Sequence, residues 1–357
     1  MGSPKSFTEL AHAIMALIAN PELHQFQVLA RDVFEFQFRS NEPYRTFCKN
    51  RGITPNEVQS WQDVPFIGNS AFKQCELTCL SEEERSRVFV SSGTTDKERS
   101  RHYHNDLSLE VYNRSLFAWF QESFLHRNFP NVERDGIEIV SLTPWSANAP
   151  HSSLVHMLTV LQPDSSKFFG RTNEEGQWLL DVDLLRSFLC SRRSNQLPIV
   201  LVGTAFNFVH LLDQTFNRPL PLPRNSVILE TGGYKGRSRT LERPDLHNQL
   251  AELFLVPQAR IRTEYGMCEL GSQGYDQPDN LGVFNFPPWT RVQILSPENG
   301  QPVAEGIPGL IQIFDLTNIA SVCAIQTSDL GIIQKGGLEL LGRDSSTSPR
   351  GCSLFAT

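Results

Sequence analysis

Hydroxyl-bearing residues and one glycine follow a short apolar stretch near residue 90. Val88-Phe89-Val90 runs directly into Ser91-Ser92-Gly93-Thr94-Thr95. Backbone N–H groups in a tight glycine turn form a concave site for an anion, and side-chain hydroxyls add further donors. Runs of Ser, Thr and Gly are also common in surface turns. The residues alone therefore leave two interpretations open, a loop that binds phosphate and a plain turn.

Three further turns that contain glycine or threonine each follow an apolar run. They are Gly203-Thr204, Thr231-Gly232-Gly233 and Tyr265-Gly266. In open α/β sheets a ligand binds beyond the carboxyl ends of the strands. We therefore expect these three turns and the loop at 91–95 to meet at one crevice.

The elements that must position these turns alternate between helix-like and strand-like patterns. Apolar residues recur at helical spacing within residues 7–38, which predicts two helices separated at Pro21. A further helix is expected from Asp106, as its N-cap, to Phe124. The other expected helices are 152–161 and 205–214, and the expected strands are 87–90, 136–142, 198–202, 226–230 and 260–264. Fully apolar strands that alternate with helices indicate parallel sheets covered on both faces.

After about Val283 the pattern changes to short strands separated by turn residues, with no helix pattern between them. The expected strands are 290–294, 309–314, 324–328 and 330–334. Strands that follow one another in this way form antiparallel sheets. A small antiparallel β region is therefore expected at this end of the chain.

Charge and hydropathy argue against several classes of function. The chain has 32 Lys and Arg against 39 Asp and Glu, a net charge of −7, whereas general nucleic-acid binders are basic. No apolar run approaches the ~18 residues of a membrane span, and the first residues lack the pattern of a signal peptide. Seven cysteines, an odd number in a long chain, do not suggest a disulfide framework. We predict a cytoplasmic protein.

Four segments resemble motifs of the adenylate-forming superfamily, which includes the acyl- and aryl-CoA ligases. Ser91–Thr95 resembles its phosphate loop, and Tyr265-Gly266-Met267-Cys268-Glu269 resembles its Tyr-Gly-x-Thr-Glu motif. Thr327-Ser328-Asp329 is similar to the Thr-Gly-Asp motif, and Gly342-Arg343 is similar to the Gly-Arg hinge motif. All four occur in the order typical of the family. One branch fits better still, because 231–236 and the tail 350–354 resemble the acyl-protein synthetases of the bacterial bioluminescence fatty-acid reductase.

The resemblance implies an α/β fold with two parallel-sheet αβα subdomains and a small antiparallel β-barrel-like region. The expected divisions are a core at 1–283, a small β region with the ribose-binding motifs at 284–344, and a mobile tail at 345–357. Members of the family usually carry a further mobile domain after the hinge, with a lysine that bridges the carboxylate and the α-phosphate. This sequence is expected to lack that domain, and Lys235 is a candidate to replace its lysine.

The resemblance also implies ATP and Mg²⁺ as cofactors. Glu269 would hold the metal, since Mg²⁺ takes one or two carboxylates together with phosphate oxygens. Asp329 would accept hydrogen bonds from the ribose, and Arg343 would contact the ribose or a phosphate. Tyr265 would stack on adenine beside the backbone at Gly232. The full set of implied nucleotide-binding residues is Ser91, Ser92, Gly93, Thr94, Thr95, Gly232, Gly233, Tyr265, Gly266, Asp329 and Arg343.

The carboxylic acid substrate is expected beside the segment at 203–206. The residues implied are Gly203, Thr204, Phe206, Met267 and Cys268. Phe206 and Phe208 are also compatible with core packing, which is the commoner place for aromatic side chains on a helix. His102, His104, His151 and His156 are candidates to orient the carboxylate.

Two residues depart from the family pattern. Asp96 stands where a glycine usually follows the phosphate loop, although Lys97, Arg99 and Arg101 follow it and offset its charge. Cys268 stands in the place of a threonine and would weaken one hydrogen bond, because an S–H group is a poor donor.

Cys352 lies in a stretch of Gly and Ser near the C-terminus, and it is a candidate acyl acceptor. A thiolate on a mobile arm could attack an acyl-adenylate and carry the acyl group away as a thioester. The predicted catalytic residues are therefore Cys352, Lys235 and Glu269. The predicted function is ATP-dependent formation of acyl-AMP, then acyl transfer to Cys352 or to a partner such as a reductase. An amide-forming ligase and a nucleotide-binding scaffold without catalysis are the alternatives.

Overall fold

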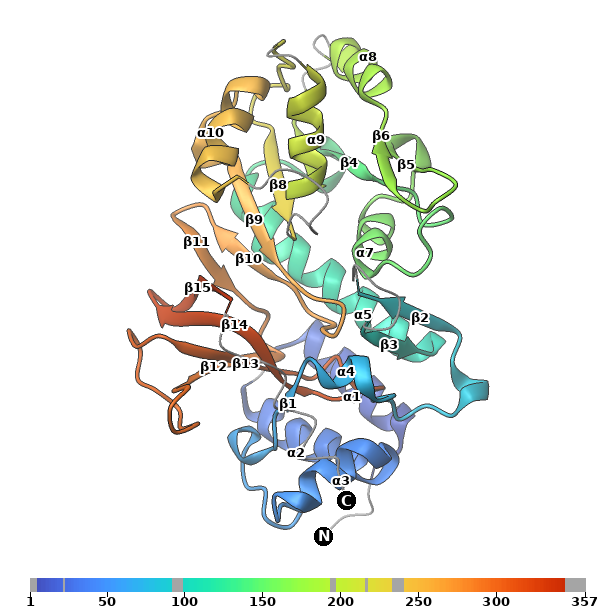
Figure 1. Ribbon diagram of the computed structural model, residues 1–357, viewed down its shortest axis with the longest axis vertical. Helices are drawn as coiled ribbons and strands as arrows, with labels where there is room; N and C mark the ends of the chain where they lie inside the picture. The colour runs from blue at the N-terminus through green and yellow to red at the C-terminus, as the bar shows by residue number, and fades with distance from the viewer. Residues whose placement is uncertain are drawn as a thin grey trace. The chain divides into compact units, whose positions relative to one another are not determined.

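The computed structural model (Figure 1) describes residues 5–21, 23–91, 99–192, 197–215, 218–232 and 241–343. The chain forms two compact units. Unit 1 comprises Met1–Trp119, Met267–Gly274 and Val283–Thr357, and unit 2 comprises Phe120–Gly266 and Tyr275–Gly282. This grouping divides the chain differently from the boundaries expected from the sequence, because the first 119 residues belong with the C-terminal strands.

Unit 1 combines short helices with an antiparallel sheet. Its helices are α1 (Phe7–Ala19), α2 (Leu23–Ser40), α3 (Glu42–Asn50), α4 (Ala71–Gln74) and α5 (Asp106–Trp119), with 3-10 turns at Trp61–Asp63 and Glu82–Glu84. Its strands are β1 (Ile67–Gly68), β2 (Arg87–Val90), β3 (Arg101–His104), β12 (Thr290–Leu295), β13 (Gly309–Asp315), β14 (Ala324–Gln334) and β15 (Gly337–Arg343), together with the second half of β11 (Asn280–Asn285).

Unit 2 contains the alternating elements. Its helical segments are the π-helix Phe120–Leu125, α6 (His126–Asn128), α7 (Ser153–Leu161), α8 (Val182–Arg192), α9 (Ala205–Thr215) and α10 (Arg243–Phe254), with 3-10 turns at Arg134–Gly136, Ser165–Lys167 and Gln258–Arg260. Its strands are β4 (Glu138–Pro144), β5 (Phe168–Thr172), β6 (Trp178–Leu180), β7 (Ile199–Thr204), β8 (Val227–Thr231), β9 (Ile261–Tyr265) and most of β10 (Gly274–Gln277).

The parallel sheet of unit 2 is built as its apolar strands predict. β4 pairs in parallel with β5 and β7, and β7, β8 and β9 follow in parallel register. Every residue of β7 and β8 is buried, which is typical of strands covered on both faces. Side chains of α8, α9 and α10 pack with these strands in one hydrophobic cluster, and Figure 1 shows these helices beside the sheet.

The sheet of unit 1 explains why the N-terminal region belongs to it. β12, β13, β14 and β15 pair antiparallel in that order, and Val283 and Phe284 of β11 pair with β15. β1 pairs in parallel with β14, with Ile67 opposite Ile325. No pairing among the described strands closes this sheet into a barrel, so the expected barrel-like form stays a prediction. The two strands expected at 324–328 and 330–334 are one strand, β14, with a register shift at Leu330/Gly331.

The strand at 87–90 was expected to belong to a parallel sheet, and this prediction is wrong. β2 pairs antiparallel with β3, with Val90 opposite Arg101, and the two form a separate two-stranded sheet within unit 1. Among the described elements, β2 is therefore followed by β3 and only then by the helix α5. Parallel pairs among the described strands are β4–β5, β4–β7, β7–β8, β8–β9 and β1–β14. A short strand that is apolar on both sides gives no sequence signal for its direction of pairing.

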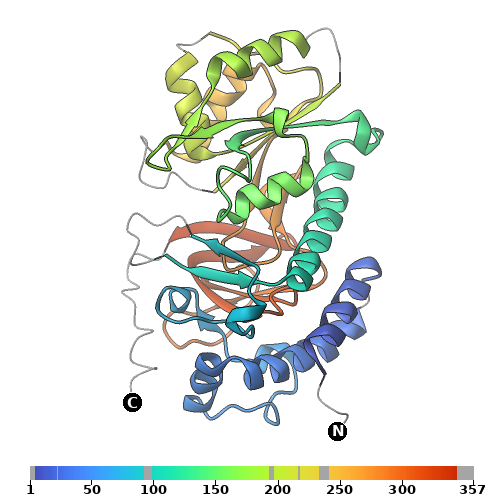
Figure 2. The ribbon, with the colours of Figure 1, turned by 90° about the vertical axis from the view of Figure 1, so that its right-hand side faces the viewer.

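The helices at the N-terminus agree with their predicted positions, and Figure 2 shows them in blue. α1 begins with a capping box, because the Ser6 and Glu9 side chains bond each other's backbone N–H groups. Asp106 was expected to be the N-cap of α5, but it is the first residue of the helix. Asn105 has that role, since its Oδ1 accepts from the Ser108 N–H at 2.8 Å. Among the described helices, none has both the length and the apolar content needed to cross a membrane.

Candidate functional site

Several residues predicted from the sequence lie outside the described part of the chain. They are Ser92, Gly93, Thr94, Thr95, Gly233, Lys235 and Cys352. The other predicted residues divide between the two units. Gly203, Thr204, Phe206, Gly232, Tyr265 and Gly266 belong to unit 2, whereas Ser91, Met267, Cys268, Glu269, Asp329 and Arg343 belong to unit 1.

Three of the predicted turns in unit 2 occupy neighbouring strand ends. In the parallel register Thr204 lies opposite Thr231, and Thr231 lies opposite Glu264. Gly232 follows with a φ of +63°, in the left-handed region that glycine adopts without strain. Unit 2 therefore presents a row of small and polar residues along one edge of its sheet, as the strand-end rule predicts.

Thr204 caps the helix that follows it. Its hydroxyl donates to the Asn207 Oδ1 at 2.7 Å and accepts from the Asn207 N–H at 3.1 Å. The Asn207 Oδ1 also accepts from the Thr204 N–H at 3.0 Å. This reciprocal pattern satisfies N–H groups that a helix start leaves without partners. The geometry thus gives Thr204 a structural role in addition to the acid-binding role suggested by the sequence.

The two phenylalanines of α9 have different environments. Phe208 is fully buried in the hydrophobic cluster, so it is a core residue. Phe206 is half-buried and stacks on His210, with ring centroids 6.0 Å apart. Of the two, only Phe206 has a surface left for a ligand.

Glu264 is a buried acid that the sequence analysis did not identify. It precedes Tyr265 at the end of β9, is 9% exposed, and accepts a hydrogen bond from the Thr231 hydroxyl. Burial raises the pKa of Glu264 to about 7, and the charge of Glu230 acts in the same direction. Near neutral pH its carboxyl group is therefore protonated in a large fraction of molecules. A glutamate next to Tyr265, at the end of a predicted strand, was the available signal.

The segment 267–274, which follows β9 in the chain, is fixed within unit 1 by two buried side chains. Asp315 accepts from the N–H groups of Gly271 and Ser272 at 3.1 and 2.8 Å. Asn318 Nδ2 donates to the Glu269 carbonyl at 2.8 Å. Gly271 is required here, because a Cβ at this position would overlap the Thr317 side chain. These bonds position the Glu269 backbone without using its carboxylate.

Glu269 is 5% exposed, and its surroundings act on its charge in opposite directions. Burial raises its pKa above the usual range. The Ser100 side chain and the positive charges of Lys73 and Arg343 lower it again. Glu269 is thus a buried acid whose charged form is favoured by two cations, Lys73 and Arg343.

The residues around Glu269 fit a magnesium ion that arrives together with its ligand. Mg²⁺ keeps several waters and takes one or two protein carboxylates with phosphate oxygens. Within the described ranges, no group of three or more His, Cys, Asp or Glu side chains is close enough to form a metal site by itself. Glu269 would therefore supply one oxygen ligand, and most of the others would come from phosphate and water.

Asp329 and Arg343 form an ion pair across two neighbouring strands. They lie opposite each other in the register of β14 and β15, and the Arg343 Nε is 3.2 Å from the Asp329 Oδ1. Asp329 lies within β14. The Arg343 side chain is 86% exposed, so a ligand can reach it. Because Arg343 also acts on Glu269, this pair belongs to the same region of unit 1.

The base of the loop at 92–98 is closed by backbone bonds between its two flanking residues. The Ser91 N–H donates to the Ser100 carbonyl at 3.0 Å, and the Ser100 N–H donates to the Ser91 hydroxyl at 2.9 Å. The Ser100 side chain also lowers the pKa of Glu269. Ser91, the first residue of the segment that resembles a phosphate loop, is therefore bonded to a residue that acts on the predicted magnesium ligand.

A buried histidine joins β3 to the segment after β9. His102 is 1% exposed, and its Nδ1 lies 3.0 Å from the Cys268 carbonyl, to which it donates. Burial lowers the pKa of His102 to about 4, so the ring is neutral near pH 7. Its neighbour His104 lies with its ring centroid 4.4 Å away and contacts Ser108. Of the histidines considered as ligands of the carboxylate, His151 and His156 belong to unit 2.

A comparison with models of known protein families shows to which family this chain belongs. The family model described as acyl-protein synthetase, LuxE, matches residues 19–356. The chain belongs to this family.

Two curated proteins similar to this LuxE-family chain are named long-chain-fatty-acid–luciferin-component ligases. The one from Aliivibrio fischeri is 24% identical over 349 residues, which cover 91% of this chain and 86% of that protein. The one from Vibrio harveyi is 24% identical over 345 residues, covering 91% and 85%. Together with the family match, they identify this LuxE-family chain as a ligase.

Solved structures show which fold the family shares. A 2-hydroxyisobutyryl-CoA ligase in an open conformation, bound to 2-HIB-AMP and CoA, matches with a TM-score of 0.61 at 14% identity over 90% of this chain and 75% of that one. The same ligase in its postadenylation state with 2-HIB-AMP matches with a TM-score of 0.62 at 13% identity, over 98% and 74%. This LuxE-family chain therefore has a mixed α/β fold similar to that of adenylate-forming enzymes.

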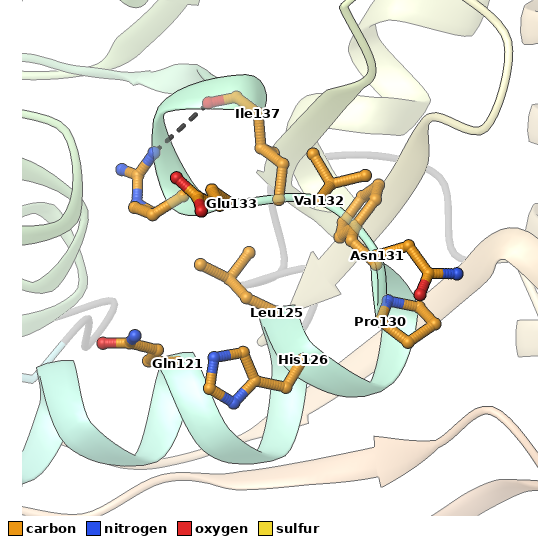
Figure 3. A pocket seen from close by; sticks show the side chains of 10 residues that line it. Gln121, Leu125, His126, Pro130, Asn131, Val132, Glu133 and Ile137 are labelled. Atoms are coloured by element: carbon orange, nitrogen blue, oxygen red, sulfur yellow. Dashed lines mark hydrogen bonds between the residues drawn. The ribbon is translucent and has the colours of Figure 1, made fainter.

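A separate cavity of about 300 Å³ lies in unit 2 and contains none of the residues predicted for the site. Figure 3 shows Gln121, Leu125 and His126 on one helical segment, with Val132 and Ile137 from the chain that follows. The Arg134 guanidinium beside it donates to the Ile137 and Leu161 carbonyls at 3.2 and 2.7 Å. Arg134 thus braces the wall of this cavity, which has no observed link to the LuxE-family motifs.

Proposed function

We propose that this chain activates a carboxylic acid with ATP and then transfers the acyl group to a thiol. The observation that carries the proposal is Glu269, a buried acid whose pKa is lowered by Ser100, Lys73 and Arg343. It lies beside the base of the Ser91–Ser100 loop, and it belongs to the Tyr265–Glu269 motif. Family membership supports the same reaction class, because the matching family is described as an acyl-protein synthetase.

The first step joins two anions, so it needs positive charge where they meet. A carboxylate oxygen attacks the α-phosphorus of ATP. The bond from that phosphorus to the bridging oxygen breaks, and pyrophosphate leaves with the electron pair. Glu269 would help to hold Mg²⁺, which neutralises charge on the phosphates when it is bound. Asp329 would hold the ribose, and Tyr265 would contact the adenine.

In the second step a thiolate attacks the acyl carbonyl carbon and AMP leaves with its oxygen. Cys352 is the candidate nucleophile within this chain, and a thiol on a partner protein is the other acceptor proposed. The curated relatives are named as ligases of a long-chain fatty acid and a luciferin component. We therefore propose a long-chain fatty acid as the substrate and a reductase as the acceptor of the acyl group.

Acid-dependent exchange between labelled pyrophosphate and ATP tests the first step. A panel of saturated acids with short, medium and long chains is compared, with benzoic acid as the aryl alternative. We expect exchange that requires both Mg²⁺ and a fatty acid and that increases with chain length. ATP binding without exchange for any acid would instead indicate a nucleotide-binding scaffold.

Acylation of the protein tests the second step. The chain is incubated with ATP, Mg²⁺ and a labelled fatty acid, and the labelled peptide is located by mass spectrometry. We expect label on Cys352 that neutral hydroxylamine removes, and none on the Cys352→Ser variant. Cys190→Ser is the matched control, because Cys190 is an exposed thiol in unit 2. Label that persists in Cys352→Ser would show that another residue accepts the acyl group.

A further inference from the structure

Lys73 lies next to the predicted nucleotide site although no motif includes it. It is an exposed residue of the short helix α4, in unit 1. The sequence around it, Ala71-Phe72-Lys73-Gln74, gives no sign of function. The reason to consider Lys73 is the position of α4 in the fold.

Two sets of contacts fix α4 beside the site residues of unit 1. On one side, the Phe72 ring meets the His102 ring edge-on, with centroids 6.2 Å apart. His102 in turn donates to the Cys268 carbonyl at 3.0 Å, one residue before Glu269. Figure 1 shows α4 beside β3, the strand that carries His102. The position of Lys73 is therefore linked directly to the backbone that presents Glu269.

On its other side, α4 is connected to the strand that carries Asp329. β1, three residues before α4, pairs in parallel with β14. Asn69 continues this pairing, since its N–H donates to the Gln326 carbonyl at 2.9 Å and its Oδ1 accepts from the Ser328 hydroxyl at 3.2 Å. The helix α4 is thus connected to β3 on one side and, through β1 and Asn69, to β14 on the other.

The charge of Lys73 is available to a ligand. Arg85 and Arg101, two other cations of unit 1, both pair with Glu76, at 2.9 and 3.8 Å. Within the described residues Lys73 has no ion pair of this kind, and its field acts on the buried Glu269. A single ammonium group on a flexible stem suits a phosphate as a point charge.

We propose that Lys73 binds the β- and γ-phosphates of the nucleotide and the pyrophosphate that leaves. This inference rests on the proposed function and adds a residue to it. Lys73 neutralises the leaving group from the side of α4. It is therefore a substrate-binding residue, and its loss weakens the hold on the two terminal phosphates but not on adenosine or the α-phosphate.

The test compares binding of ATP, pyrophosphate and AMP to the wild-type chain, Lys73→Ala and Lys73→Arg by calorimetry. For Lys73→Ala we expect the Kd of ATP and of pyrophosphate to rise about tenfold, while the Kd of AMP changes less than about twofold. Lys73→Arg should recover most of the affinity, because the charge is kept. Lys49→Ala is the matched control, since Lys49 is an exposed lysine in the last turn of α3 in the same unit.

The measurement is repeated in EDTA to separate Lys73 from Glu269 and its metal. The effect of Lys73→Ala should persist there, because a direct contact with phosphate needs no magnesium. An effect that disappears in EDTA, or a loss of ATP and AMP binding to the same extent, would overturn the proposal. Unchanged ATP binding in Lys73→Ala would overturn it as well. A wild-type chain that binds no ATP would instead refute the proposed function itself.

Discussion

The two units present their predicted site residues in different ways. In unit 2, residues 204, 231 and 264 lie side by side because parallel strands are in register. In unit 1, the pKa of Glu269 is lowered by Ser100, Lys73 and Arg343, which come from segments far apart in the chain. The first arrangement follows from a regular sheet, whereas the second depends on individual side chains that fix loops.

This difference shows where sequence reasoning works and where it needs a structure. A strand end can be recognised from an apolar run and the turn that follows it. A loop held by Asp315 or Asn318 leaves no such pattern, because each bond joins residues more than 40 positions apart. Substitutions should therefore affect the two units differently, and the following predictions test this contrast.

The largest effect is expected at the centre of unit 1. Glu269→Gln keeps the size of the side chain and removes its charge. We expect acid-dependent pyrophosphate exchange to fall by about 10³-fold, on the order of 4 kcal/mol of transition-state stabilisation, because a buried charge that faces phosphate and metal is lost. Exchange within tenfold of wild type would mean that Glu269 does not hold the metal. Glu82→Gln, an exposed acid of the same unit, should have no effect.

The next prediction tests whether hydrogen bonds from residues distant in the chain hold the segment 267–274 in place. Asp315 is fully buried and accepts five hydrogen bonds, from Gly271 N, Ser272 N, Ser272 Oγ, Thr317 N and Thr317 Oγ1. Asp315→Ala leaves these donors without their acceptor and should lower the free energy of unfolding by about 3 to 4 kcal/mol.

Urea denaturation measures this loss, and hydrogen exchange locates it. We expect faster exchange in the segment 267–274 and unchanged exchange in β7 and β8 of unit 2. Uniformly faster exchange throughout the chain would show that the two units do not respond separately. An exchange pattern like that of wild type would show that Asp315 is not the anchor of this loop.

A third prediction concerns the buried acid of unit 2. The pKa of Glu264 is raised from 4.5 to about 7, mainly by burial. The folded chain therefore holds a proton on Glu264 that the unfolded chain releases above about pH 4.5. The contribution of Glu264 to stability is greatest below that pH and falls as pH rises toward 7.

Glu264→Gln removes this titration and keeps an acceptor for Thr231. Above pH 7 the variant should be more stable than wild type by on the order of 2 to 3 kcal/mol, and near pH 4.5 the two should be equal. Urea denaturation over this pH range measures the difference, with the exposed Glu252→Gln as the control. A difference that does not depend on pH would mean that Glu264 is ionised throughout, paired with a group not yet identified.

Much of unit 2 and the antiparallel strands could be predicted from the sequence. The helices near the N-terminus and strands β7, β8 and β9 were expected from their apolar patterns and are confirmed. The direction of β2 was not predictable, because Arg87–Val90 reads the same in a parallel and an antiparallel sheet. The position of Lys73 near the site was not predictable either, because it depends on the pairing of β1 with β14. This position therefore depends on contacts between distant parts of the chain.

The smallest effect separates two roles of one residue at the sheet edge of unit 2. The sequence suggests that Thr204 contacts the acid, whereas its hydroxyl is engaged with Asn207 at the start of α9. Thr204→Val keeps the shape and removes the hydroxyl. The loss of the cap should cost about 1 kcal/mol of stability, and the KM for the fatty acid should change less than twofold.

Thr204→Ser is the matched variant, because it keeps the hydroxyl that caps α9. It should unfold like wild type, so the two variants together isolate the hydrogen bond from the methyl group. If Thr204→Val raises the KM for the acid about tenfold and leaves the unfolding midpoint unchanged, the hydroxyl serves the substrate and not the helix. In that case a side chain at a strand end of unit 2 would bind the substrate directly. The two units would then differ less in how they present their site residues.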